Sequence, residues 1–262
     1  MIRLFLATMA LLVASASTLH AAPADESTQK QYYEVRTYVL SESGDQAMLD
    51  RYLRDAWLPA VKRLGIGPVG VFSPAASDTN NRPMVVVVIP ASDSESLVSL
   101  RMKLRGDAKY QSAAKAYWDR AGDSPVFERV SSELLVAMDC MPEARRPDGT
   151  LSNADRVFEL RLYESATEKL GELKVDMFNN GEVPIFLDCG IQPIFLGQCV
   201  LGPQSPSLTY LTVYPSEETR LAAWKKFRAH PDWQVLKKVP KYLGTVSKID
   251  KYVLRPKPYS QM

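Results

Sequence analysis

The chain has 262 residues, with 32 Lys and Arg against 30 Asp and Glu and a formal net charge of +2. Because 46% of the residues are hydrophobic and 24% are charged, the chain can bury a sizeable core in one large or two small domains. A surface that binds nucleic acid or an anionic membrane needs an excess of basic residues. The charge balance excludes such an excess, and we expect no nucleic-acid partner.

Residues 1–21 are predicted to be a secretory signal peptide. Arg3 precedes an apolar run over 4–14, and small residues then lead to Ala21 and Ala22. We expect cleavage near Ala21 or Ala22, a flexible N-terminal segment over 22–30, and a periplasmic or secreted protein. The apolar run is shorter than the roughly 20 residues of a transmembrane helix, and no later stretch approaches that length, so no membrane span is expected.

The rest of the chain is predicted to contain one unit twice, over 31–141 and 155–255. Glu34 recurs as Glu159, 125 positions later. The same offset relates these pairs: Arg36 and Arg161, Tyr38 and Tyr163, Pro59 and Pro184, Gly65 and Gly190. An offset held over more than fifty residues indicates a duplication. Residues 142–154 are predicted to be a linker because they are rich in charge and turn formers, and residues 256–262 a tail.

In chain order, repeat one begins with a predicted strand around 33–39, where apolar and polar residues alternate. Apolar residues at helical spacing then predict a helix over 49–64, which Pro59 should kink. Strands are expected at 69–72 and at the nearly all-apolar 84–89. A second helical region over 95–118 and a strand over 130–138 complete the unit.

Repeat two predicts the same order of elements, with a first strand at Glu159, a helix from about 168, strands near 191–200 and 208–214, a helix around Trp224, and a last strand at 249–254. The order β-α-β-β-α-β is that of a ferredoxin-like unit. The helices cover one face of each four-stranded sheet, so the other face must be buried elsewhere. We therefore predict the α+β class, with two tandem ferredoxin-like units packed sheet to sheet as an intrachain dimeric α/β barrel.

Three stretches of the sequence resemble NIPSNAP domains. They are the Glu-x-Arg-x-Tyr strand, the Pro-bearing helix that leads to 64–70, and the run 224–233. In that family a Trp-x-x-Phe run precedes an Asp-Pro-Glu-Trp-like element, whose acids are replaced here by His230 and Asp232. The resemblance covers both repeats and implies a ferredoxin-like α/β-barrel fold. It implies protein contacts for eukaryotic members, which are associated with mitochondria and vesicle traffic, and it implies no activity for exported bacterial members.

The polar faces of the two first strands are the predicted site, formed by Glu34, Arg36, Tyr38, Glu159, Arg161 and Tyr163. If Tyr33, Val35, Thr37 and Val39 face the helices, these six side chains point into the space between the sheets. Buried ionised groups must be paired, so one reading is a Glu–Arg network that joins the halves. The other reading is a polar cavity that holds a small anionic molecule through Arg36 and Arg161.

The remaining motifs favour structural roles. His230 is the only histidine left after processing, and Pro231 suits the first position of a helix, so we expect His230 to cap it. The glycines of 65–70 follow a helix, whereas a dinucleotide loop must open one. No cofactor and no metal are expected, and Cys189 and Cys199 are too far apart along one strand for a disulfide. Core packing is expected for the tryptophans, which are Trp57, Trp118, Trp224 and Trp233.

Two functions from different classes fit these residues. The favoured hypothesis is an exported, non-catalytic protein that binds a small polar or anionic ligand or a protein partner. The alternative is a barrel enzyme, such as a cofactor-free monooxygenase or isomerase, with its site between the two sheets. The enzyme hypothesis requires an open pocket there with a titratable group beside it. A homo-oligomer is left open.

Overall fold

The computed structural model describes residues 29–41, 44–80, 82–147 and 155–262. The predicted signal peptide, most of the segment 22–30 and the second half of the linker lie outside these ranges. Repeat one contains β1 (Tyr32–Val39), α1 (Gln46–Arg51), a π-helical turn (Tyr52–Trp57), α2 (Leu58–Arg63), β2 (Gly70–Pro74), β3 (Met84–Ala91), α3 (Ser94–Val98), α4 (Leu100–Arg105), α5 (Ala108–Trp118) and β4 (Arg129–Ala137).

Repeat two has the same order of strands and helical regions, β-α-β-β-α-β. Its elements are β5 (Val157–Glu164), α6 (Glu168–Met177), a π-helical turn (Phe178–Glu182), α7 (Val183–Asp188), β6 (Gln192–Leu201), β7 (Ser207–Tyr214), α8 (Glu217–Ala229), α9 (Pro231–Leu236), a 3₁₀ turn (Pro240–Tyr242) and β8 (Lys248–Pro256).

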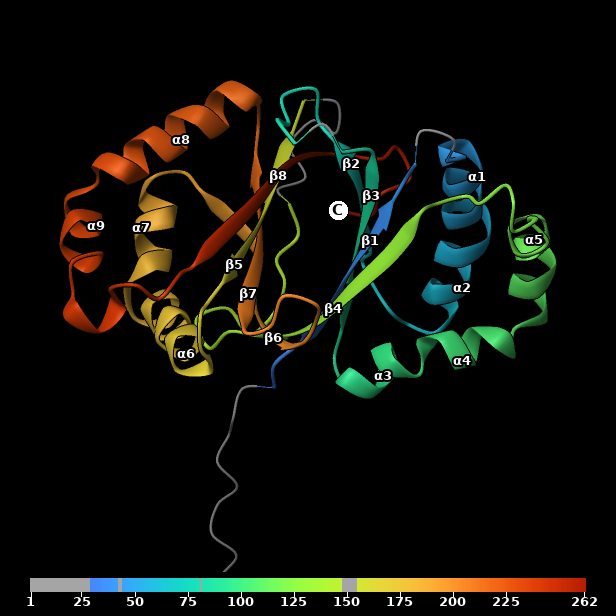
Figure 1. The fold of residues 1–262 in the computed structure, drawn as a ribbon, viewed down its shortest axis with the longest axis horizontal. Helices are drawn as coiled ribbons and strands as arrows, with labels where there is room; N and C mark the ends of the chain where they lie inside the picture. Colours follow the sequence, from blue (N-terminus) through green and yellow to red (C-terminus); the bar gives the residue numbers. More distant parts are fainter. Residues whose placement is uncertain (1–28, 42–43, 81, 148–154) are drawn as a thin grey trace, which may run out of the picture.

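The described strands form one closed antiparallel barrel in the order β1-β3-β2-β8-β5-β7-β6-β4. Within each repeat the first strand is central, and the repeats meet where β2 pairs with β8 and β4 pairs with β6. Helices α1–α5 cover one side of the barrel and α6–α9 the other (Figure 1). The predicted intrachain α/β barrel is confirmed. Closure satisfies both edges of each sheet, which would otherwise expose unpaired backbone groups.

Both Pro-bearing helices contain a π-helical turn directly before the proline-containing segment. Pro59 lies in the first turn of α2 and Pro184 in the first turn of α7. Proline offers no amide hydrogen, and its ring clashes with the carbonyl four residues earlier, so the regular hydrogen-bond ladder cannot continue. The predicted kink thus takes the form of a widened turn, and it occurs in both repeats.

The hydrophobic core has three main layers. One cluster fills the barrel and combines residues of both repeats, such as Tyr33, Phe72, Phe158 and Phe195. The other two lie between the sheet and the helices of each repeat. The C-terminus reaches the middle of the barrel (Figure 1), where the Met262 side chain is only 2% exposed.

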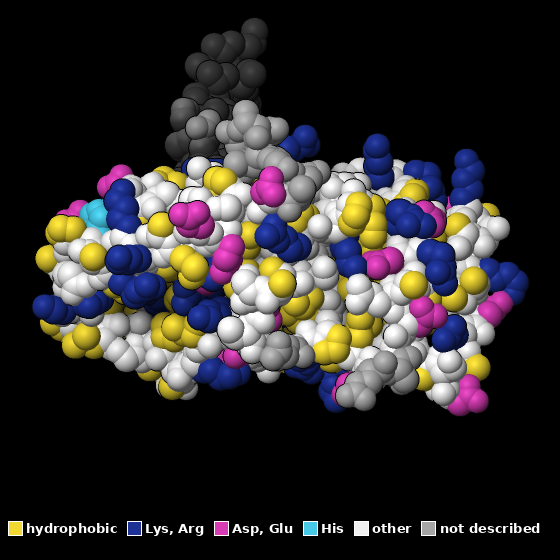
Figure 2. All heavy atoms as spheres, turned by 90° about the horizontal axis from the view of Figure 1, so that it is seen from above, with side chains coloured by type: hydrophobic (Ala, Val, Ile, Leu, Met, Phe, Trp, Pro, Cys, Tyr) yellow, Lys and Arg dark blue, Asp and Glu magenta, His cyan; other side chains and the backbone are white. Residues whose placement is uncertain are grey.

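The surface carries charges of both signs. Figure 2 shows Lys and Arg interspersed with Asp and Glu over the face it displays. Lys225 and Lys226 lie on the exposed side of α8. Among the residues the structure describes, none of the helices combines the length and apolar character needed to cross a membrane.

Candidate functional site

The six predicted site residues face the helices instead of the barrel interior, so the predicted face assignment is wrong. Tyr33 and Val35 belong to the cluster inside the barrel, whereas Tyr38 packs with residues of the covering helices. Both faces of β1 are covered, so alternation of polar and apolar residues cannot tell which face is inside. The closed interior favours uncharged side chains because it admits little water to solvate ions.

In repeat one, Glu34 and Arg36 form a paired group on the outer face of β1. The Arg36 Nε and Nη2 atoms donate to the two Glu34 oxygens at 2.8 and 3.0 Å, and Ser132 donates to Glu34 at 2.8 Å. The guanidinium also lies over the Trp57 ring, 5.4 Å from its centroid. Burial lowers the pKa of Arg36, but Tyr38 and Glu34 outweigh burial and raise it, so Arg36 stays charged.

In repeat two, Glu159 has more partners than Glu34. Arg161 lies 3.2 Å from one Glu159 oxygen. The other oxygen accepts hydrogen bonds from Arg220 and, at 2.9 Å, from the indole nitrogen of Trp224. Tyr163 forms a hydroxyl hydrogen bond with Tyr210 at 2.8 Å. Each network therefore lies within its own repeat, and the predicted polar joint between the halves is not formed by these residues.

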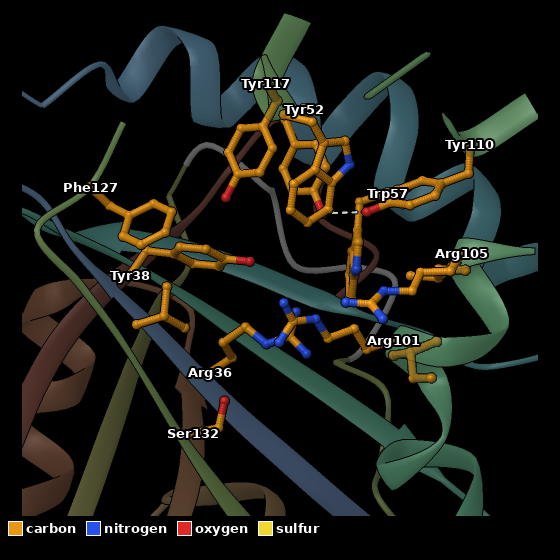
Figure 3. A pocket seen from close by; sticks show the side chains of 14 residues that line it. Arg36, Tyr38, Tyr52, Trp57, Arg101, Arg105, Tyr110, Tyr117, Phe127 and Ser132 are labelled. Atoms are coloured by element: carbon orange, nitrogen blue, oxygen red, sulfur yellow. Dashed lines mark hydrogen bonds between the residues drawn. The ribbon is translucent and has the colours of Figure 1, made fainter. Parts of the chain in front are cut away.

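A cavity of about 400 Å³ opens between the sheet and the helices of repeat one, and we call it the repeat-one cavity (Figure 3). Arg36 and Tyr38 line it from β1, and Arg101 and Arg105 reach it from α4. Half of its lining residues are aromatic. The aromatic residues are Tyr38, Tyr52, Trp57, Tyr110, Tyr117, Trp118 and Phe127. The volume is within the range of small-molecule sites.

The aromatic wall is held in a fixed arrangement. The rings of Tyr52 and Tyr117 are stacked with centroids 3.7 Å apart and an interplanar angle of 7°. The Tyr52 and Tyr110 hydroxyls share a hydrogen bond of 2.8 Å (Figure 3). Burial raises the pKa of Tyr52 and of Tyr117, so both phenols stay neutral at physiological pH. The wall is thus a flat, uncharged surface suited to a planar ring.

The charges of the repeat-one cavity are predominantly positive. Arg36, Arg101 and Arg105 point into it (Figure 3), and Glu34 is the carboxylate bonded to Arg36. Within the described part of the chain, neither Arg101 nor Arg105 has an ion pair with a carboxylate. A guanidinium group presents forked N–H donors that match the oxygens of carboxylates and phosphates, so the cavity is suited to an anion.

The corresponding cavity of repeat two is smaller, about 290 Å³, and it contains its own ion pair. Lys174 binds Glu182 at 2.6 Å, and both side chains are nearly inaccessible. The Lys174 ammonium lies 4.8 Å from the centroid of Phe178 and 5.8 Å from that of Trp233. In the repeat-two cavity, Lys174 and Glu182 thus cover aromatic rings. In the repeat-one cavity, the aromatic rings are open to a ligand.

Apolar side chains of both repeats fill most of the barrel interior, and space remains at one end. There, a cavity of about 180 Å³ contains Glu133, whose Oε2 accepts a hydrogen bond of 2.8 Å from Thr209. Burial raises the pKa of Glu133 to about 7, despite that hydrogen bond. We call it the barrel-end cavity. The enzyme hypothesis required a pocket of this kind, but Glu133 was not predicted from the sequence.

Other candidate groups have structural roles. The His230 Nδ1 atom accepts a hydrogen bond of 3.2 Å from the backbone of Asp232 at the start of α9, which confirms the predicted cap. Cys140, Cys189 and Cys199 are free thiols. Within the described ranges, no cluster of three His, Cys, Asp or Glu side chains has the arrangement of a metal site. Trp57 and Trp224 are buried as predicted, but Trp118 is half exposed and lines the repeat-one cavity.

Comparison with known families identifies the second repeat. Residues 158–261 match the family model described as NIPSNAP. The chain thus contains a NIPSNAP domain over these residues. The match begins on β5 and ends in the C-terminal segment, so the NIPSNAP domain contains Glu159, Arg161 and Tyr163. The NIPSNAP-like character of repeat one stays a prediction.

Solved structures share the barrel. A candidate monooxygenase of Fusobacterium nucleatum has a TM-score of 0.55 at 8% identity, over 87% of this chain and 93% of that chain. One of Lactobacillus acidophilus has a TM-score of 0.51 at 9% identity, over 87% and 94%. At this identity the likeness shows the fold alone. A NIPSNAP-like domain protein of Burkholderia xenovorans covers 40% of this chain at 20% identity and a TM-score of 0.36. A search of curated proteins gave no match.

Sequence reasoning found Arg36 and Tyr38 but missed most of the repeat-one cavity. Arg101 and Arg105 are four positions apart, so they lie on one face of a helix. Tyr110, Tyr117 and Trp118 follow on the next helix. The sequence thus shows two arginines one helical turn apart, followed by three aromatic residues. Their convergence with β1 depends on how the helices pack, which local patterns do not specify.

Proposed function

We propose that this protein is an exported, non-catalytic binding protein whose repeat-one cavity holds a small molecule with a planar ring and an anionic group. The combination of the aromatic wall with Arg36, Arg101 and Arg105 carries this proposal. Export rests on the pattern of residues 1–21.

The two halves of the proposed ligand correspond to two parts of the cavity. Its ring packs on the aromatic wall, where the stacked Tyr52 and Tyr117 rings are already in place. Its anionic group lies at the arginines of α4, because Arg36 is already bound to Glu34. Repeat two contributes no equal site, since its cavity is smaller, Lys174 and Glu182 neutralise each other there, and Arg228 is the one cation of its described lining without an ion pair. The proposal therefore includes one ligand per chain.

Isothermal titration calorimetry with 2-naphthoate and with the uncharged 2-naphthylmethanol tests this proposal. We expect saturable binding of both, with the carboxylate bound at least about tenfold more tightly, as a charge-assisted hydrogen bond predicts. The double variant Arg101→Ala, Arg105→Ala should remove that difference and leave the alcohol affinity unchanged. Trp118→Ala should weaken both ligands.

Lys225→Ala is the matched control, because it removes an exposed cation from α8 in the other repeat. It should leave both affinities unchanged. Equal affinity for the acid and the alcohol would exclude an anion site, and absence of saturable binding of either compound to the wild-type protein would contradict the proposal as a whole.

The enzymatic alternative has one observation in its favour. The barrel-end cavity lies between the two sheets and contains Glu133, whose pKa of about 7 suits proton transfer near neutral pH. A cofactor-free monooxygenase would consume oxygen when hydroxyaromatic compounds are added. Oxygen uptake that depends on such a compound and is lost in Glu133→Gln would favour the enzyme, and uptake unchanged from a protein-free control would favour the binding protein.

A further inference from the structure

The barrel-end cavity is separate from the repeat-one cavity, although both are formed by β1 and β4. Thr37 and Val39 line the barrel-end cavity, whereas Arg36 and Tyr38, between them in sequence, line the repeat-one cavity. Successive side chains on a strand point to opposite faces. The barrel-end cavity therefore has its own chemistry, and what it binds is independent of the function proposed above.

Both repeats contribute to the barrel-end cavity. Glu133 and Arg129 come from β4 of repeat one, and Leu160 and Thr209 come from β5 and β7 of repeat two. Its volume of about 180 Å³ is below that of sites for drug-sized molecules, so its ligand must be small. The cavity exists only because the two repeats close into one barrel.

Glu133 is a carboxyl group without a cationic partner in this cavity. Within the described ranges its one hydrogen-bond donor is Thr209, which is completely buried and binds Oε2. Removing a carboxylate from water is costly unless a cation or several donors compensate it. Its Oε1 atom therefore offers an unfilled acceptor site to a ligand that brings a cation.

The charged groups near the outer end of the cavity differ from Glu133 in their pairing. Asp250 accepts bonds of 2.8 Å from both Lys248 and Gln204, so its charge is compensated. Arg82 and Arg129 are exposed, and no described carboxylate forms an ion pair with either. Tyr252 is the remaining titratable group of the lining. The cavity thus combines a carboxylate inside with two available guanidinium groups outside.

The spacing of these groups sets the length of a matching ligand. Arg129 and Glu133 lie on the same face of β4, four residues apart, which is about 13 Å along a strand. Their side chains extend several ångströms, so the gap fits a short chain with charges at its two ends. The wall between them is apolar and includes Val35, Leu160 and Leu162. Methylene groups would pack there without losing a hydrogen bond.

We propose that the barrel-end cavity binds a short ω-amino acid, with its ammonium group on Glu133, its methylene chain on the apolar wall and its carboxylate on Arg82 and Arg129. The ammonium would supply the cation that Glu133 lacks. The carboxylate would bind the two exposed arginines. The geometry assigns this site to both repeats together.

Calorimetric titration with 6-aminohexanoate, hexylamine and hexanoate at about pH 8 tests the proposal, because Glu133 is then mostly ionised. We expect the amino acid to bind most tightly. Glu133→Gln, which preserves the shape of the side chain, should weaken it at least about tenfold. Arg129→Ala should weaken the amino acid and leave hexylamine unchanged. Glu95→Gln, an exposed acid on α3, is the control and should have no effect.

Three results would overturn the site. They are the absence of saturable 6-aminohexanoate binding to wild-type protein, equal affinity in the folded Glu133→Gln variant, and hexanoate binding as tightly as the amino acid. Far-ultraviolet circular dichroism establishes that each variant is folded. These ligands lack a ring, so a negative result with 6-aminohexanoate does not affect the test of the repeat-one cavity with 2-naphthoate. A negative result with 2-naphthoate likewise does not affect the test of the barrel-end cavity.

Discussion

At the scale of single residues, the two copies of the Glu-x-Arg-x-Tyr strand differ in how their glutamates are compensated. Glu34 depends on Arg36 and Ser132, whereas Glu159 has Arg161, Arg220 and Trp224. The Arg161 Nε atom is buried with no hydrogen-bond partner. The same three-residue motif therefore contributes differently to stability in the two repeats.

We predict that Arg36→Ala destabilises the protein more than Arg161→Ala. Removing Arg36 leaves Glu34 without its cation, at a cost of about 3 kcal/mol. Removing Arg161 leaves Glu159 with two partners and also removes an unsatisfied Nε, so about 1 kcal/mol is expected. Urea unfolding of the two variants measures the difference. A larger loss in Arg161→Ala would contradict the assigned partners.

Glu133 should make stability depend on pH. Its pKa in the folded protein is about 7, above its ordinary value of 4.5, because of burial. Between these values the folded state binds more protons than the unfolded state, so this group's contribution falls as pH rises. Glu133→Gln has no group that titrates there, so it avoids the loss of stability at high pH. It should be about 3 kcal/mol more stable than wild type above about pH 8, with little difference near pH 4.

The free energies of unfolding of wild type and Glu133→Gln across that pH range give the measurement. A difference that is constant with pH would show that Glu133 titrates normally in the folded protein. Glu128→Gln, an exposed acid close by in sequence, should show no such dependence.

At the scale of elements, the C-terminal segment is a part of the barrel that local patterns did not reveal. The backbone of Gln261 and the Ser260 hydroxyl bond to Val69 and Val71 at 3.0 and 2.9 Å. The Tyr259 hydroxyl donates to Asp50 at 2.5 Å. Met262 packs inside the barrel, where Gly70 leaves space for its sulfur. The residues expected to be a tail thus run along residues 69–71 and end inside the barrel.

Deleting residues 257–262 should therefore destabilise the protein by at least about 3 kcal/mol, from the buried Met262 side chain and the lost hydrogen bonds. Urea unfolding measures this loss, and Met262→Leu is the control because it keeps a similar volume. An unchanged unfolding midpoint after the deletion would show that the segment contributes nothing to the fold.

The order of elements was predictable because strands and helices have different apolar periods and because the duplication repeats them. Pairing of β2 with β8 and of β4 with β6 follows from the need to satisfy sheet edges. Which face of β1 lies inside was not predictable, since Tyr33 and Val35 and also Tyr38 are all buried. The cavities depend on the packing of separate elements, so only Arg36, Tyr38, Arg161 and Tyr163 among their lining residues were named in advance, and they were expected on the opposite face.

At the scale of the whole molecule, the presence of both repeats in one chain allows them to differ. The repeat-one cavity is open and has uncompensated arginines, whereas Lys174 and Glu182 occupy the equivalent region of repeat two. Two identical subunits would have two identical sites. The fused chain can keep one ligand site while the other half contributes a packed core.

Native mass spectrometry of the protein purified from its own source tests the proposed ligand site most directly. We predict one small acidic molecule per chain on the wild-type protein and its loss in the folded double variant Arg101→Ala, Arg105→Ala. A wild-type protein that carries no such molecule, or a double variant that retains it equally, would contradict an anion site in the repeat-one cavity.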